Sequence, residues 1–192
     1  MTFVFAAAFL LAGPPRFLGP PEKKPAEGEP PAVNVGEPAP PFAGTVVNPD
    51  AAGAQRVDLG VLVGRGATAK PSPKAILISF LSSSCEACRK ELAVLQRLST
   101  EYRDRGLLVI GVALDRDAAA ARRTAELLRE HQVTYPVIED RDLRISRQYL
   151  GATPRFPSLV LVDGEGKVVA AKKGYADDPS TFLPAQADGA LR

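Results

Sequence analysis

Short apolar runs alternate with stretches of helical periodicity along most of the chain. Residues 75–81, 107–114 and 158–162 are apolar runs of buried-strand length. Residues 85–103 and 118–130 lie between the strands and carry an apolar stripe or i,i+4 charge pairs, which predict helices. Strands that alternate with helices predict a central sheet with parallel strands.

The later part of the chain adds shorter elements. We expect an extended piece at 133–139 and a short helix at 142–150. The Asp-Gly-Glu-Gly sequence at 163–166 then joins the last apolar run to a further strand at 167–172, which predicts an antiparallel hairpin at the sheet edge. A final helix over 181–191 would contain a proline and a glycine, which argues against it.

The N-terminal residues differ from the rest. Residues 1–13 hold an apolar stretch too short to span a bilayer comfortably, followed by Gly-Pro-Pro, and predict a signal peptide or an uncleaved anchor, although no Lys or Arg precedes the stretch. Residues 14–34 are rich in Pro, Glu, Lys and Gly, which is typical of a disordered linker. Residues 35–192 are expected to form one domain, with 65–74 as an inserted loop of no assigned role.

The composition is that of a globular domain. Of the 192 residues, 45% are hydrophobic and 24% are charged, and the formal net charge is +2. Without a basic surplus, nucleic acid is not an expected partner.

The chain has two cysteines, Cys85 and Cys88, placed where an apolar run gives way to a helix. Three serines at 82–84 precede them and suit a turn and a helix N-cap. Positions i and i+3 of a helix share a face, so the two sulfurs reach disulfide separation with modest adjustment. The positive end of the helix dipole favours the thiolate at Cys85, which predicts that this cysteine is the nucleophile.

Two simpler roles explain the cysteine pair less well. A bridge across so short a loop restrains the unfolded chain weakly. A zinc ion needs about four ligands, whereas the chain offers this pair and a single histidine, His131. A redox role is therefore the preferred interpretation, and no metal or other cofactor is expected.

A glutamate interrupts the apolar stripe of the cysteine-bearing helix. At about 100° per residue, Glu91 lies within about 60° of the apolar positions 94, 95, 98 and 102, and Cys88 falls on the same side. The residues four positions away are uncharged, which weakens the alternative of a surface ion pair. We hypothesise that Glu91 lies beneath the cysteines with a raised pKa and exchanges protons with Cys88 as the disulfide opens and closes.

Three segments together resemble the TlpA/ResA-type branch of the thioredoxin-like superfamily. They are FLSSSCEACRKEL at 80–92, FPSLVLVDGEGKVV at 156–169 and VGEPAPPF at 35–42. The resemblance covers about residues 35–175 and implies an α/β, thioredoxin-like fold: a central mixed β-sheet flanked by helices, with an N-terminal strand extension.

The resemblance also implies roles for individual residues. Cys85 would be the attacking thiol, Cys88 the resolving thiol and Glu91 the glutamate that the family places near its active site. Pro157 would follow a cis peptide bond that faces the disulfide, with Pro154 as the rival position.

The surroundings of the motif follow from the same resemblance. A cis bond would expose the backbone of Phe156 to a client, and Glu86 and Ala87, between the cysteines, complete the expected client contacts. The chain has no tryptophan, and Leu81 and Ser84 stand where the family usually has one. This makes the surface around the thiols smaller and more polar.

The leading functional hypothesis is an exported thiol–disulfide oxidoreductase, periplasmic or otherwise extracytoplasmic, with the N-terminal segment as an alternative membrane tether. Its expected partners are cysteine-containing protein clients and a membrane or periplasmic thiol redox partner. Reduction of the client is favoured, because Glu86 and Glu91 oppose thiolate formation and so favour the disulfide form of the enzyme.

Two other functions compete with this one. A peroxiredoxin-like peroxidase would explain Ser82, three residues before Cys85, but Ile78 replaces the proline expected upstream. A redox sensor or copper carrier is a non-enzymatic alternative. Copper-binding relatives space their cysteines as C-x-x-x-C with a remote histidine, whereas His131 ends a charged helix and is expected at the surface.

Overall fold

The computed structural model describes residues 32–174 together with Gly189 and Leu191. The expected leader at 1–13, most of the expected linker at 14–34 and nearly all of the doubtful helix at 181–191 lie outside the described residues. Within them, Val33 is already buried in the core, and no helix is both long enough and apolar enough to cross a membrane.

The centre of the molecule is a five-stranded mixed sheet in the order β5-β4-β3-β6-β7. β3 pairs in parallel with β4, and β4 with β5, whereas β6 runs antiparallel to both β3 and β7. The predicted mixed sheet and its closing hairpin are therefore confirmed. The strands span β3 Ala75–Leu81, β4 Leu107–Ala113, β5 Val137–Glu139, β6 Ser158–Asp163 and β7 Val168–Lys173.

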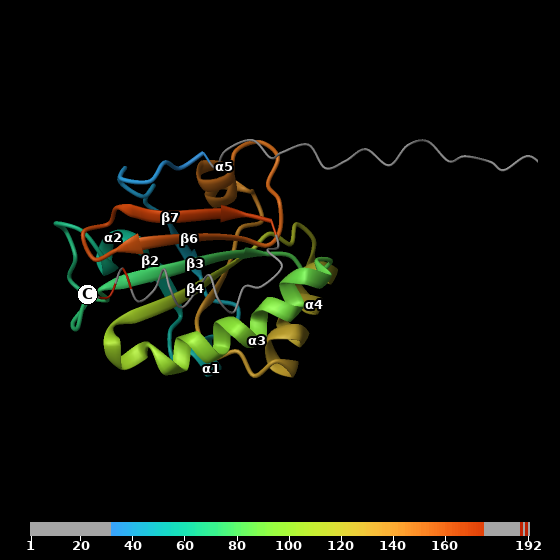
Figure 1. Ribbon diagram of the computed structural model, residues 1–192. Helices are drawn as coiled ribbons and strands as arrows, with labels where there is room; N and C mark the ends of the chain where they lie inside the picture. The colour runs from blue at the N-terminus through green and yellow to red at the C-terminus, as the bar shows by residue number, and fades with distance from the viewer. Residues whose placement is uncertain (1–31, 175–188, 190, 192) are drawn as a thin grey trace, which may run out of the picture.

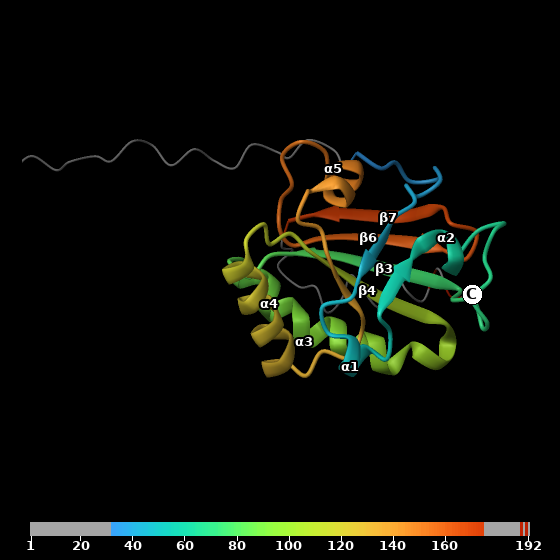
Figure 2. The same cartoon turned by 180° about the vertical axis from the view of Figure 1, so that it is seen from behind.

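Helices lie on both sides of this sheet, as Figures 1 and 2 show. α3 and α4 cover one face, while α5 and the N-terminal strands cover the other. All seven residues of β3 are buried, which explains why its sequence is an unbroken apolar run. The helices span α3 Glu86–Glu101, the 3-10 turn η1 Arg103–Arg105, α4 Ala118–Glu130 and α5 Arg144–Leu150.

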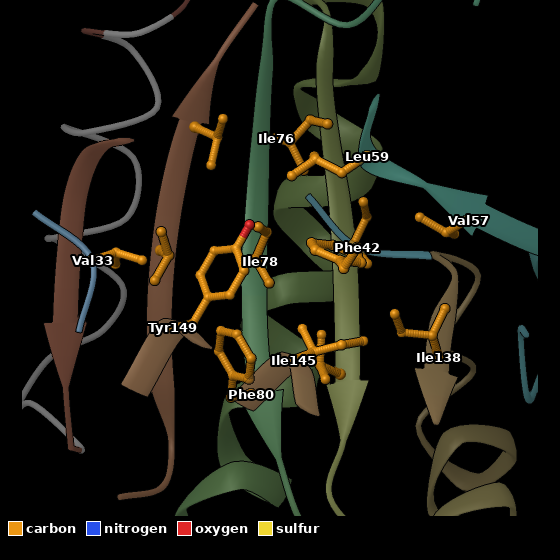
Figure 3. Close-up of a cluster of buried hydrophobic side chains, with 14 of the residues drawn as sticks. Val33, Phe42, Val57, Leu59, Ile76, Ile78, Phe80, Ile138, Ile145 and Tyr149 are labelled. Atoms are coloured by element: carbon orange, nitrogen blue, oxygen red, sulfur yellow. The ribbon is translucent and has the colours of Figure 1, made fainter. Parts of the chain in front are cut away.

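Two core clusters fill the space on either side of the sheet. The first packs the α5 side and centres on aromatic rings: Tyr149 lies 5.8 Å from Phe42 and 5.5 Å from Phe80, measured between ring centroids (Figure 3). The Tyr149 hydroxyl also donates to Pro40 O at 2.6 Å, which ties α5 to the N-terminal segment. The second packs between the sheet and α3 and includes Leu77, Leu95 and Cys88.

The N-terminal extension consists of short elements. β1 (Ala43–Thr45) and β2 (Arg56–Asp58) pair antiparallel as a separate two-stranded sheet. A bridge between Val46 and Ile138 links this hairpin to the edge strand β5. α1 (Pro49–Ala52) and α2 (Leu59–Leu62) complete the extension.

The β5 strand is shorter than the extended piece predicted at 133–139. The Thr134 N–H donates to the Gln96 side chain at 2.8 Å, and Pro136 has no N–H, so the strand ladder begins only at Val137. The loop at 65–74 leads directly into β3. It therefore lies at the opposite end of that strand from the cysteines, about 20 Å away, because a strand rises about 3.3 Å per residue.

Candidate active site

The two cysteines form a disulfide at the N-terminus of α3, with their Cα atoms 5.2 Å apart. Cys85 is itself the N-cap residue, in extended conformation, and its sulfur accepts the backbone N–H of Cys88 at 3.1 Å. The serines at 82–84 were expected to supply the cap, and this was wrong. Their side chains bond elsewhere, and the helix begins one residue later, at Glu86.

The two sulfurs differ in exposure. Cys85 is half-buried, whereas Cys88 is only 3% exposed and belongs to the second core cluster. The Cys85 sulfur is therefore more accessible from solvent than the Cys88 sulfur. The N-cap position also places the Cys85 sulfur beside the free N–H groups of the first helical turn, which stabilise a thiolate.

The segment before β6 lies next to the cysteines. Phe80, near the end of β3, pairs with Ser158, so Pro157 stands beside the end of the strand that leads to Cys85. The Phe156–Pro157 bond is cis, as the resemblance implied, and the bond before Pro154 is not. Pro157 is buried, and Phe156 is half-buried against the second core cluster, which includes Cys88 and against which Cys85 also packs.

Glu91 lies one helical turn beyond Cys88 and is only 3% exposed. The predicted position inside the apolar stripe is confirmed. Burial raises the pKa of its carboxyl to about 7, while the positive charge of Lys172 and the Ser79 hydroxyl lower it to a smaller extent. The Ser79 hydroxyl faces the carboxyl without the geometry of an ordinary hydrogen bond.

Strand register explains why these groups meet around Glu91. Ser79 of β3 pairs with Leu159 of β6, which in turn pairs with Lys172 of β7, so the three side chains lie in one row beneath α3. Tyr135 also interacts with Glu91. Burial is the main cause of the raised pKa of the Tyr135 hydroxyl, and the negative charge of Glu91 raises it further. Sequence reasoning missed Ser79 and Lys172, which strand register brings to Glu91, and Tyr135, which the path of the chain before β5 brings there.

The two residues between the cysteines lie at the surface. The Glu86 side chain is 79% exposed and pairs with Lys90 at 3.3 Å, and Ala87 is half-buried. Solvent screens an exposed charge strongly, so Glu86 influences the thiols much less than the buried Glu91 does.

A buried aspartate at the end of β4 holds the serine loop. Asp115 is 5% exposed; its Oδ1 accepts the Ser83 hydroxyl at 2.9 Å, the Ser83 N–H at 3.2 Å and the Ser82 hydroxyl at 3.2 Å. Its Oδ2 accepts the Thr124 hydroxyl from α4. The sequence carried a signal for this contact, because polar residues that follow neighbouring parallel strands meet at one sheet edge.

The remaining candidates from the sequence do not join this site. His131 is the half-buried C-cap of α4, and in the segment 32–174 no three His, Cys, Asp or Glu side chains gather as a metal ion would require. The Ser82 hydroxyl, on which the peroxidase alternative rested, is bonded to Asp115 and Ser84.

Comparisons with known proteins show what the chain is similar to. The Redoxin family model matches residues 35–190. The thiol-disulfide oxidoreductase ResA of Bacillus thuringiensis subsp. konkukian is 27% identical over 101 residues, 53% of this chain and 56% of the relative. ResA of Bacillus subtilis is 25% identical over 120 residues, 62% of this chain and 59% of the relative. The chain thus matches somewhat more than half the length of these curated relatives.

Solved structures show the same fold. A candidate thiol:disulfide interchange protein DsbE from Chlorobium tepidum is similar with a TM-score of 0.68 and 22% identity, covering 83% of this chain and 99% of that one. The thioredoxin domain of a thiol-disulfide oxidoreductase from Bacteroides vulgatus is similar with a TM-score of 0.60 and 23% identity. The match covers 80% of this chain and 97% of that one. The predicted thioredoxin-like fold is confirmed.

Proposed function

The chain belongs to the Redoxin family, and we propose that it is an exported thiol–disulfide oxidoreductase that reduces the disulfides of extracytoplasmic protein clients. The similarity to ResA proteins confirms the TlpA/ResA-type resemblance. The observation that carries the proposal is the Cys85–Cys88 disulfide at the N-terminus of α3, with Cys85 half-buried, Cys88 buried, and Phe156 packed against the same core cluster.

The reaction begins with the reduced protein. The Cys85 thiolate attacks one sulfur of a client disulfide; the client S–S bond breaks, a Cys85–client disulfide forms, and the first client sulfur leaves and takes a proton from water. Cys88 then gives up its proton and attacks Cys85 Sγ. The Cys85–Cys88 disulfide forms and the second client thiol is released, so two electrons pass to the client. A thiol redox partner, membrane-bound or periplasmic, restores the dithiol by the reverse exchange.

Glu91 is well placed to accept the proton that Cys88 gives up. It lies one turn away on the same helix face, and burial places the pKa of its carboxyl at about 7, so near neutral pH it is partly ionised and can both take and return a proton. Its negative charge, when present, opposes thiolate formation at the cysteines. That effect favours the disulfide form of the enzyme and supports reduction as the direction of transfer.

Client contact is assigned to the surface around Cys85. Phe156 offers a half-buried aromatic ring, and Glu86 and Ala87 border the accessible sulfur from the helix side. The apolar N-terminal stretch supports export, because its length is that of a signal peptide. The named ResA relatives support the same class of activity.

A trapping experiment tests the proposal. Cys88→Ser removes the resolving sulfur, so a mixed disulfide between Cys85 and a client should accumulate in the producing cell and be released by a reductant. The matched control is Cys85→Ser, which keeps one buried thiol and should trap nothing. Purified wild-type protein should also accelerate reduction of insulin disulfides by dithiothreitol. Absence of both the adducts and the insulin reduction would overturn the proposal.

A further inference from the structure

The serine loop before Cys85 is fixed by one buried carboxylate. Asp115 follows β4 and accepts four hydrogen bonds, three from Ser82 and Ser83 and one from Thr124. All but Ser82 are largely buried, with exposures of 5% for Asp115, 3% for Ser83 and 2% for Thr124. Hydrogen bonds of this kind restrain their groups strongly, because a buried carboxylate left unpaired is costly.

The restraint extends to the reactive sulfur. The Ser82 carbonyl accepts the Cys85 N–H at 3.0 Å, so the residue held by Asp115 also fixes the backbone of Cys85. The backbone of Cys85 in turn places its sulfur within 3.1 Å of the Cys88 N–H. A continuous chain of hydrogen bonds therefore runs from Thr124 of α4, through Asp115 and the serine loop, to the N-cap of α3.

We propose that Asp115 is a positioning residue for thiol exchange, whose carboxylate holds the serine loop so that the Cys85 sulfur stays in place for attack by Cys88. This inference rests on the proposed oxidoreductase function. Asp115 touches neither sulfur in the described hydrogen bonds; it acts through Ser82 and Ser83. The step it assists is closure of the Cys85–Cys88 disulfide, in which the Cys85–client bond breaks and the client thiol leaves.

Two substitutions separate hydrogen bonding from charge. Asp115→Asn removes the charge but keeps Oδ1 for the serines, and its amide can donate to the Thr124 hydroxyl, which is able to accept. Asp115→Ala removes the charge and all four bonds. A difference between the two variants therefore reports the loss of the hydrogen bonds and of the buried side-chain volume, and not the loss of charge; an Asp140→Ala control accounts for the volume.

The test mixes the reduced protein with one equivalent of 5,5′-dithiobis(2-nitrobenzoic acid), which should react in two steps. The first release of thionitrobenzoate reports attack by Cys85, and the second reports closure by Cys88. Because small misplacement of reacting groups slows intramolecular steps severely, we expect the second release to be roughly tenfold slower in Asp115→Ala than in Asp115→Asn. Equal second-step rates in the two variants would overturn the proposal.

Asp140 provides a matched control. It is 4% exposed, follows β5 at the same sheet edge, and accepts the N–H groups of Ile145 and Ser146 at the start of α5. Its bonds do not reach the serine loop, so Asp140→Ala should lower the melting temperature while leaving the second release within about twofold of wild type. A tenfold slowing there would mean that loss of any buried, hydrogen-bonded aspartate slows closure, which would also overturn the proposal.

A second variant keeps the test decisive if Asp115→Ala does not fold. Ser82→Ala together with Ser83→Ala removes two of the loop bonds while Asp115 keeps Thr124 and the Ser83 N–H. Closure should slow by about threefold or more, and wild-type closure in this variant would count against the proposal. If the wild-type protein itself shows no second release, the oxidoreductase function fails instead.

Discussion

Glu91→Gln should make the stability of the folded protein less dependent on pH. The substitution removes an ionisable group from the buried face of α3 and keeps nearly the same volume. In the wild-type protein, burial raises the pKa of this carboxyl from 4.5 to about 7. The glutamine side chain does not titrate, so the comparison of the two proteins isolates the cost of ionising a carboxyl at this position.

The magnitude follows from linkage between protonation and folding. Below pH 4.5 both the folded and unfolded chains hold the proton, so Glu91 adds no pH dependence. Between pH 4.5 and about 7 the unfolded chain loses the proton while the folded chain keeps it, and stability falls as pH rises. Since each pKa unit corresponds to 1.36 kcal/mol, the loss reaches about 3 kcal/mol above pH 7.

Urea unfolding of the oxidised proteins, followed by circular dichroism across this pH range, measures the effect. In the oxidised form the cysteines do not titrate, and other groups cancel between wild type and variant. Glu91→Gln should gain stability relative to wild type by about 3 kcal/mol on going from acidic to mildly alkaline pH. Glu130→Gln, an exposed position on α4, should show a change within about 0.5 kcal/mol. A wild-type-minus-variant difference that does not vary with pH would refute the reasoning.

Two further predictions concern the accessible side of the site. Iodoacetamide at neutral pH should label Cys85 before Cys88 in the reduced protein, because Cys85 is half-buried at the helix N-cap and Cys88 is 3% exposed. Peptide mass spectrometry measures the order of labelling, and labelling of Cys88 first would contradict the assignment of Cys85 as the nucleophile. If Phe156 contacts the client as proposed, Phe156→Ala should slow reduction of insulin by roughly tenfold and leave iodoacetamide labelling within about twofold, because the small reagent does not use that contact. Equal slowing of both reactions would assign Phe156 to packing alone.

Much of the fold could be predicted because local patterns and tertiary structure agree. β3 is an apolar run because both of its faces are covered. The Asp-Gly-Glu-Gly turn joins β6 and β7 into an antiparallel hairpin at the position expected from the sequence. The cysteine pair and Glu91 were also accessible to sequence reasoning, because their spacing on one helix fixes their common face without knowledge of the sheet.

The surroundings of these residues could not be predicted in the same way. Ser79, Lys172 and Tyr135 approach Glu91 only because of strand register and the path of the chain before β5. The serines at 82–84 suited a helix cap by residue type, but Asp115 accepts the hydroxyl groups of Ser82 and Ser83, the Ser84 hydroxyl bonds to Ser82, and the cap is left to Cys85. Local propensity describes what a segment can do, whereas a distant partner decides which option is taken.

Burial of Glu91 links the stability of the protein to its proposed chemistry. Desolvation is the largest cause of the raised pKa, and the same desolvation lowers the stability of the folded state when the carboxyl ionises. An exposed glutamate would not lower stability in this way, but it would hold a proton poorly at neutral pH. An apolar residue at this position would stabilise the core but could not accept a proton. Lys172 and Ser79 keep the pKa of the carboxyl from rising further, so that it can still ionise. The position is therefore unfavourable for packing and well suited to proton exchange with Cys88 near neutral pH, which is the compromise expected where function and stability compete.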